Sequence, residues 1–108
     1  MKRAEQEAIN NMCEMAYETA MEEYRESHTD WKRLRSCTAE VCETDNYYIL
    51  RSYNTIVAVM EKAYDMLYDV LRMVSGYTAT SAQHISKFDC DYSSGSWKNA
   101  EHLIYRNI

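Results

Sequence analysis

The sequence has no proline, only two glycines and only one phenylalanine among its 108 residues. Linkers and disordered segments are usually rich in proline or glycine, so the composition predicts one folded domain without a long linker. No apolar run approaches the roughly 18 residues of a membrane span. The first residues, MKRAEQEAINNM, lack the apolar centre of a signal peptide. We therefore expect a cytoplasmic protein, in which the four cysteines are reduced.

The short motifs of several enzyme and metal-binding classes are also missing. There is no CxxC, no HxxxH and no GxxxxGK, and the three histidines are scattered. Cys37 and Cys42 would need a histidine brought in by the fold to bind zinc, and a role as small buried apolar residues explains the cysteines better. His84 and Cys90 fall on different faces of one expected helix, so they do not indicate nucleophilic catalysis. We predict no catalytic, cofactor-binding or metal-binding residues.

Acidic residues outnumber basic ones in the sequence, 17 against 12, which gives a formal net charge of -5. This balance disfavours non-specific binding to nucleic acid or anionic lipid, both of which require a basic surface. The first 30 residues hold eight carboxylates against Lys2, Arg3 and Arg25. Such a run is either a solvated helix face or an acidic, nucleic-acid-like surface that occupies a basic groove of another protein.

Two helices are expected in the N-terminal part. Apolar residues recur at steps of three and four from Lys2 to Ser27, which predicts a helix with an apolar stripe along one face. Most side chains of this stripe are small or flexible. The stripe comprises Ile9, Met12, Cys13, Ala16, Ala20 and Tyr24. It can pack on its own domain or on a second copy of the chain. Residues 27–30 then form a break, and the spacing of Trp31, Leu34 and Val41 predicts a second helix from Trp31 to Cys42.

The remainder reads as strands and one helix. Residues 47–60 are rich in aromatic and β-branched side chains, which predicts a strand with a bulge or a strongly twisted middle near residues 52–54. Residues 56–74 fit either a helical stripe or a second strand. Thr80 and Gln83 match a capping box, which predicts a helix over residues 81–92 that buries Ile85 and Phe88. A last strand is expected over residues 102–108.

Three segments together resemble a known family: YNTIVA at residues 53–58, YDVLR at residues 68–72 and YTATSAQHISKF at residues 77–88. The family consists of small uncharacterised proteins of phages and mobile elements from gut Firmicutes. The match covers about residues 47–92 and leaves residues 1–42 outside. The resemblance implies a three-stranded antiparallel sheet backed by a helix, with residues 56–74 as a hairpin. The resemblance implies no established activity. The occurrence of the family in phages and mobile elements suggests an inhibitor of host defence, for example an anti-CRISPR protein.

The overall expectation is an α+β fold in one domain, 1–108, with N-terminal helices over residues 1–43 packed against a β-β-α-β unit over residues 47–108. The predicted function is a non-catalytic inhibitor that binds a host protein effector, such as a CRISPR nuclease, through an acidic surface. The expected contact residues are Glu14, Tyr17, Glu18, Glu22, Glu23, Tyr24 and Glu26. The alternative is a small DNA-binding regulator that uses Lys32, Arg33 and Arg35.

Overall fold

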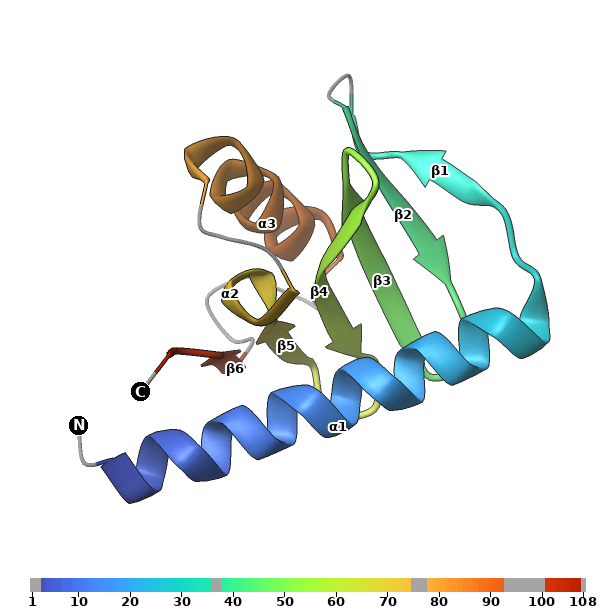
Figure 1. The fold of residues 1–108 in the computed structure, drawn as a ribbon. Coiled ribbons are helices and arrows are strands. Elements are labelled where there is room, and N and C mark those ends of the chain that lie inside the picture. Colours follow the sequence, from blue (N-terminus) through green and yellow to red (C-terminus); the bar gives the residue numbers. More distant parts are fainter. Residues whose placement is uncertain (1–2, 36–37, 75–77, 93–100, 108) are drawn as a thin grey trace.

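The computed structural model describes residues 3–35, 38–74, 78–92 and 101–107. They form an α+β fold in which a sheet lies between one long helix and two shorter ones (Figure 1). The helices are α1 (Arg3–Ser27), α2 (Leu71–Val74) and α3 (Ala79–Tyr92). The strands are β1 (Trp31–Arg33), β2 (Ala39–Glu43), β3 (Tyr47–Ser52), β4 (Thr55–Glu61), β5 (Met66–Asp69) and β6 (Glu101–Ile104).

The sheet has six strands in the order in which they occur along the chain. Strands β1 to β5 form an antiparallel meander, and β6 pairs parallel with β5. The parallel pairing requires a crossover, and α2 and α3 lie within that connection. The α+β class is confirmed, and the expected last strand is present as β6. The expected three-stranded antiparallel sheet is wrong, because β1 and β2 were not anticipated, the segment 47–60 forms two strands, and β6 pairs parallel with β5.

The second helix expected from Trp31 to Cys42 is also wrong. These residues form β1 and β2, with Trp31 opposite Cys42 and Arg33 opposite Glu40. The apolar positions that suggested a helical face instead occupy two very short strands. Strands of three and five residues are too short to display a clear alternating pattern.

The segment expected as one long strand is a hairpin. Strands β3 and β4 are joined by a tight turn at Tyr53 and Asn54, and the φ angle of Tyr53 is 59°. The bulge lies further along, since Leu50 pairs with Ala58 and Arg51 pairs with Ile56. That register leaves the residue between Ile56 and Ala58 as the extra residue of β4.

The hairpin interpretation of residues 56–74 is confirmed in its first part. Strand β4 pairs antiparallel with β5, with Met60 opposite Leu67. Strand β5 ends at Asp69, whose side chain accepts a hydrogen bond of 3.1 Å from the N–H of Leu71. The chain therefore turns into the short α2, where a continued strand was expected.

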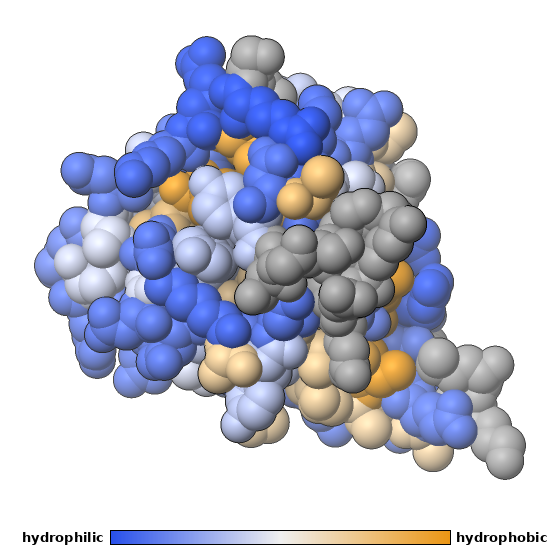
Figure 2. Space-filling view, turned by 180° about the vertical axis from the view of Figure 1, so that it is seen from behind, coloured by the Kyte–Doolittle hydropathy of each residue, from blue (hydrophilic) through white to orange (hydrophobic). Residues whose placement is uncertain are grey.

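Both faces of the sheet are apolar, and each is covered by helix. On one face α1 packs its small buried residues Cys13, Ala16 and Ala20 against the sheet, so the stripe of α1 is used within its own domain. On the other face α3 buries Ile85 and Phe88, as predicted. Hydrophilic residues cover most of the surface seen in Figure 2, and apolar ones appear there as small patches. In the described ranges, none of the helices is both long and apolar enough to cross a membrane.

Two helix details differ from expectation. Helix α3 begins at Ala79, and its N-cap is Thr78, whose hydroxyl accepts a 3.1 Å hydrogen bond from the N–H of Ser81. The expected cap, Thr80, lies inside the helix. In α1 the stripe was misjudged at Met12, which is 44% exposed. The sequence also predicts a break at residues 75–77 and a loop at residues 93–96, and both segments lie outside the described residues.

Candidate functional site

The outer side of α1 carries a row of carboxylates that none of the other described helices and strands covers. Four exposed glutamates follow one another at intervals of four residues: Glu14, Glu18, Glu22 and Glu26. Side chains at this spacing lie on the same face of a helix. With a rise of about 1.5 Å per residue, neighbours are about 6 Å apart along the axis and the row spans about 18 Å. We call these four residues the acidic ridge.

The charges of the acidic ridge are not compensated locally. No basic residue occurs between Arg3 and Arg25, and Arg25, which is next to Glu26 and three residues after Glu22, forms no ion pair with either in the described structure. Within the part of the chain that the structure describes, none of the four ridge carboxylates forms an ion pair. Each like-charge pair at four-residue spacing destabilises a helix by about 0.2–0.5 kcal/mol. The three successive pairs of the ridge therefore oppose folding, and they leave its negative field free to act on a partner.

Two methionines flank the acidic ridge and were missed as surface residues. Met12 is 44% exposed and Met15 is 68% exposed. Both line a shallow groove of about 210 Å³ between α1 and the rings of Tyr47 and Tyr68. Methionine is flexible and polarisable, and it is frequent at surfaces that accept partners of varied shape. The helical spacing of Met12 placed it in the core stripe, and no other signal in the sequence marks it as exposed.

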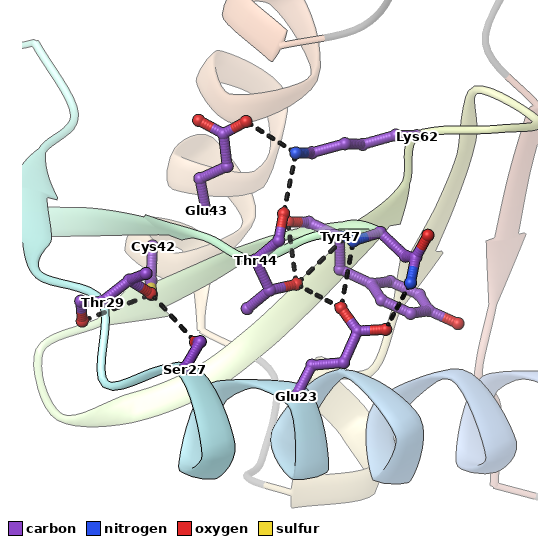
Figure 3. A network of polar contacts seen from close by, with 9 residues as sticks. Glu23, Ser27, Thr29, Cys42, Glu43, Thr44, Tyr47 and Lys62 are labelled. Carbon is purple, nitrogen blue, oxygen red and sulfur yellow. Dashed lines mark hydrogen bonds and ion pairs between the residues drawn. The ribbon is translucent and has the colours of Figure 1, made fainter.

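Glu23 has a different role from the ridge glutamates, because its carboxylate is used inside the fold (Figure 3). Glu23 Oε1 accepts hydrogen bonds from the Thr44 hydroxyl at 2.7 Å and from the Asn46 N–H at 3.0 Å. Its Oε2 accepts one from Asn46 Nδ2 at 2.8 Å. Burial alone would raise the pKa of Glu23, but these hydrogen bonds and the charge of Lys62 outweigh it and lower the pKa. Glu23 thus ties α1 to the turn between β2 and β3.

The two tyrosines of the expected contact surface face the sheet. The Tyr24 hydroxyl oxygen accepts a 3.0 Å hydrogen bond from Trp31 Nε1, and the two rings lie 5.3 Å apart. Tyr17 is half-buried and packs against the core on the α1 side. The structure therefore places four of the seven expected residues together on the outside of α1 and turns Tyr17, Glu23 and Tyr24 inward.

The basic residues of the alternative interpretation lie on or beside the edge strand β1. Lys32 and Arg33 are exposed on that strand. Arg35 donates two hydrogen bonds to the carboxylate of Asp91, at 2.7 and 2.8 Å. Arg35 is therefore held by α3, and only two of the three residues present their charges on the short strand. Charged residues on an edge strand also serve to prevent pairing with another sheet.

The cysteines and histidines form no metal cluster among the residues that the structure describes. The three described cysteines are free of disulfides: Cys13 and Cys42 are buried, and Cys90 is exposed. Cys37 lies outside the described residues. His84 is buried and bonds back to the sheet, with Nδ1 2.8 Å from the Ser52 hydroxyl. Burial and the charge of Lys87 lower the pKa of His84. These positions support a structural role for His84.

No protein-family model matches the chain, and no curated protein or solved structure is significantly similar to it. The acidic ridge is the feature of the molecular surface that breaks a local rule of helix stability without a compensating contact in the described structure.

Proposed function

We propose that this protein is a non-catalytic binding protein that presents the acidic ridge of α1 to a basic surface of a partner protein. The resemblance to proteins of phages and mobile elements suggests what that partner is. We propose a nuclease effector of bacterial defence, such as a CRISPR nuclease, whose nucleic-acid channel is basic. In this interpretation the protein is an anti-CRISPR inhibitor that occupies the channel in place of nucleic acid.

The observation that carries the proposal is the uncompensated ridge. Its four carboxylates lie in one row on a rigid helix that the sheet holds in place. Because the helix is already folded, binding has to order the glutamate side chains but not the backbone that carries them. Complementary charge of this kind steers association and gives specificity toward a basic surface. Met12 and Met15 beside the row supply apolar contact area that a purely electrostatic patch would lack.

The test compares inhibition by the wild type with inhibition by charge-reversed variants. The ridge variant is Glu18→Lys/Glu22→Lys, which leaves Glu23 and its structural hydrogen bonds intact. The matched control is Asp30→Lys/Asp45→Lys, because these exposed carboxylates lie off the ridge and the net charge changes equally. Each protein is titrated into DNA cleavage by guide-loaded type II and type V nucleases, at low and high salt, after circular dichroism has confirmed folding.

The wild type is expected to inhibit at least one nuclease, and less strongly as salt rises, because exposed charges are screened. A single exposed pair contributes only about 0–1 kcal/mol, but reversal of two ridge charges also adds repulsion, so affinity should fall by about tenfold to a hundredfold. The control should lose little. Wild type that inhibits no nuclease of the panel would contradict the anti-CRISPR proposal. Equal losses in both variants would show that only net charge matters and would remove the ridge from the mechanism.

A further inference from the structure

Two large apolar side chains lie exposed together on α1, at the groove between this helix and the sheet. Met12 is 44% exposed and Met15 is 68% exposed. Both line the groove of about 210 Å³ whose other wall is formed by Tyr47 of β3 and Tyr68 of β5. The described part of the chain exposes only two other large apolar side chains to this degree, and both lie in turns. Single exposed apolar residues are ordinary, but a pair that shares one groove is typical of a contact surface.

The groove follows α1 for about two turns. Its helical wall consists of Met12, Met15, Ala16 and Thr19. These positions are i, i+3, i+4 and i+7, which share one face of a helix, and at about 1.5 Å per residue they span about 10 Å. The Thr19 hydroxyl donates to the Met15 carbonyl oxygen at 2.9 Å, so it is already satisfied within α1. A second helix packs along a stripe of this spacing.

Negative charge flanks the groove on the helix and on the sheet. On α1, Glu18 follows Met15 by three residues and therefore lies beside it on the helix surface. On the sheet, Glu61 Oε1 accepts a 3.1 Å hydrogen bond from the hydroxyl of Tyr68. None of the described residues that line the groove is basic. An apolar surface that enters the groove must therefore carry positive charge at its margins, or else it meets uncompensated carboxylates.

The hydroxyl of Tyr47 adds a polar group that a partner can use. The Tyr47 side chain is only 6% exposed. Within the described structure its hydroxyl forms no hydrogen bond, and it is not sealed from solvent. Burial raises the pKa of Tyr47, and the charges of Glu61 and Glu23 raise it further, so the hydroxyl stays protonated at neutral pH. Its oxygen can accept a hydrogen bond from a lysine or arginine side chain, which carries donors only.

Building on the proposed binding function, on which this inference rests, we propose that the groove docks an amphipathic basic helix of the partner protein. One apolar side chain of that helix is seated between the two methionines and the tyrosine rings, and its lysine or arginine residues lie along the acidic ridge. Flexible methionines suit this role, because they adapt to the side chain they receive. A nucleic acid or a second copy of this acidic chain would bring like charge to the ridge, and a small cation would leave the methionines exposed.

The test uses three synthetic helical peptides of about 18 residues, or about five turns. The first has leucine along one face and lysine elsewhere, the second replaces each leucine by glutamine, and the third replaces each lysine by glutamate. Isothermal titration calorimetry measures the binding of each peptide to the full-length protein. The first peptide should bind about tenfold or more tightly than the second, because a buried leucine is lost, and the third should not bind. Equal binding of the first two peptides would overturn the proposal.

The groove variant is Met12→Gln/Met15→Gln, which keeps charge, side-chain length and helix propensity and removes the apolar surface. It should bind the leucine peptide about tenfold more weakly than the wild type, at low and at high salt alike, because no charge has changed. The matched control Met12→Leu/Met15→Leu keeps the apolar area and should bind about as tightly as the wild type. Circular dichroism confirms that both variants are folded.

Unchanged binding of the leucine peptide by the folded glutamine variant would contradict the proposal. Self-association of the wild type in sedimentation that the glutamine variant abolishes would also contradict it, since a second copy would then be the occupant of the groove. The peptides contain no nuclease, so a protein that binds the leucine peptide through the groove and inhibits no nuclease supports the docked helix while it contradicts the anti-CRISPR proposal. Inhibition of a nuclease by wild type and glutamine variant alike would contradict the docked helix and leave the anti-CRISPR proposal intact.

Discussion

Asn10 of α1 and Arg106, which follows β6, exchange two hydrogen bonds across 96 positions of the chain. Asn10 Nδ2 donates to the Arg106 carbonyl oxygen at 2.8 Å, and the Arg106 N–H donates to Asn10 Oδ1 at 3.0 Å. Gln6 supports the pair, because its Nε2 donates to Asn10 Oδ1 at 2.8 Å and to the Ile104 carbonyl oxygen at 3.1 Å. These bonds resemble those of a neighbouring strand. They allow α1 to cover the open edge of β6.

The first prediction concerns this connection. Asn10→Ala leaves the Arg106 N–H and carbonyl without their partner, and it should destabilise the protein by about 1–3 kcal/mol in urea unfolding. Asn11→Ala is the matched control, since Asn11 is exposed on the same helix and the change in helix propensity is identical. If both variants unfold at the same urea concentration, the hydrogen bonds between Asn10 and Arg106 contribute nothing to stability.

The second prediction uses the lowered pKa of Glu23. Because the folded state holds this pKa below the usual value of 4.5, the stabilisation is complete above pH 4.5 and is lost as the pH falls through the folded pKa. Glu23→Gln should therefore destabilise the protein near pH 7, by about 1 kcal/mol or more, and the difference from wild type should shrink in acid. Thermal unfolding between pH 3 and pH 7 measures this. Glu22→Gln on the adjacent exposed position should not destabilise the protein near pH 7, because it removes repulsion from Glu18 and Glu26 and no hydrogen bond. A constant deficit for Glu23→Gln at every pH would contradict the linkage.

The third prediction separates the thiols. Burial raises the pKa of Cys13 to about 12, assisted by the charges of Asp69 and Glu14. Cys42 is also buried, whereas Cys90 is exposed. Because the thiolate is the reactive form, Cys90 should be alkylated by iodoacetamide about a hundredfold or more faster than Cys13 in native protein. Peptide mass spectrometry after timed labelling gives the rates. All four cysteines should react in denaturant. Fast labelling of Cys13 in the native protein would show that α1 detaches from the sheet.

The first helix could be predicted to within a residue, because a pattern of 25 residues with three- and four-residue spacing has no competing interpretation. The structure of the region that follows this helix could not be predicted from the sequence. Trp31, Leu34 and Val41 fit a helical face and two short strands equally well, and only the pairing of β1 with β2 and of β2 with β3 decides between them. The parallel pairing of β5 with β6 is equally invisible, since more than 30 residues separate their partners.

The sequence predicts that the N-terminal helix is acidic, but it does not predict which of its glutamates face outward. A count of carboxylates places Glu22 and Glu23 in one acidic run, yet only Glu22 remains on the outer surface. The difference depends on where Thr44 and Asn46 lie, which is a property of the turn between β2 and β3.

The last prediction tests the acidic ridge in the free protein. Glu18 is the middle of two like-charge pairs, with Glu14 before it and Glu22 after it. Glu18→Gln removes both repulsions with almost no change in helix propensity, so it should stabilise the protein by about 0.4–1 kcal/mol at low salt. The gain should disappear in about 1 M salt, where the screening length is about 3 Å. Urea unfolding at two salt concentrations measures this gain in stability, with Asp45→Asn as a control outside the helix.

The same Glu18→Gln variant should bind a basic partner more weakly. The negative charges that repel one another in the free protein are the charges that attract the partner, so removing one of them stabilises the fold and weakens binding. A ridge that only keeps the surface hydrated would give no such opposition between stability and binding. Because one exposed pair contributes only about 0–1 kcal/mol, the variant that excludes the ridge as the contact surface is a folded and fully active Glu18→Lys/Glu22→Lys, with Glu18→Gln supplying the stability measurement.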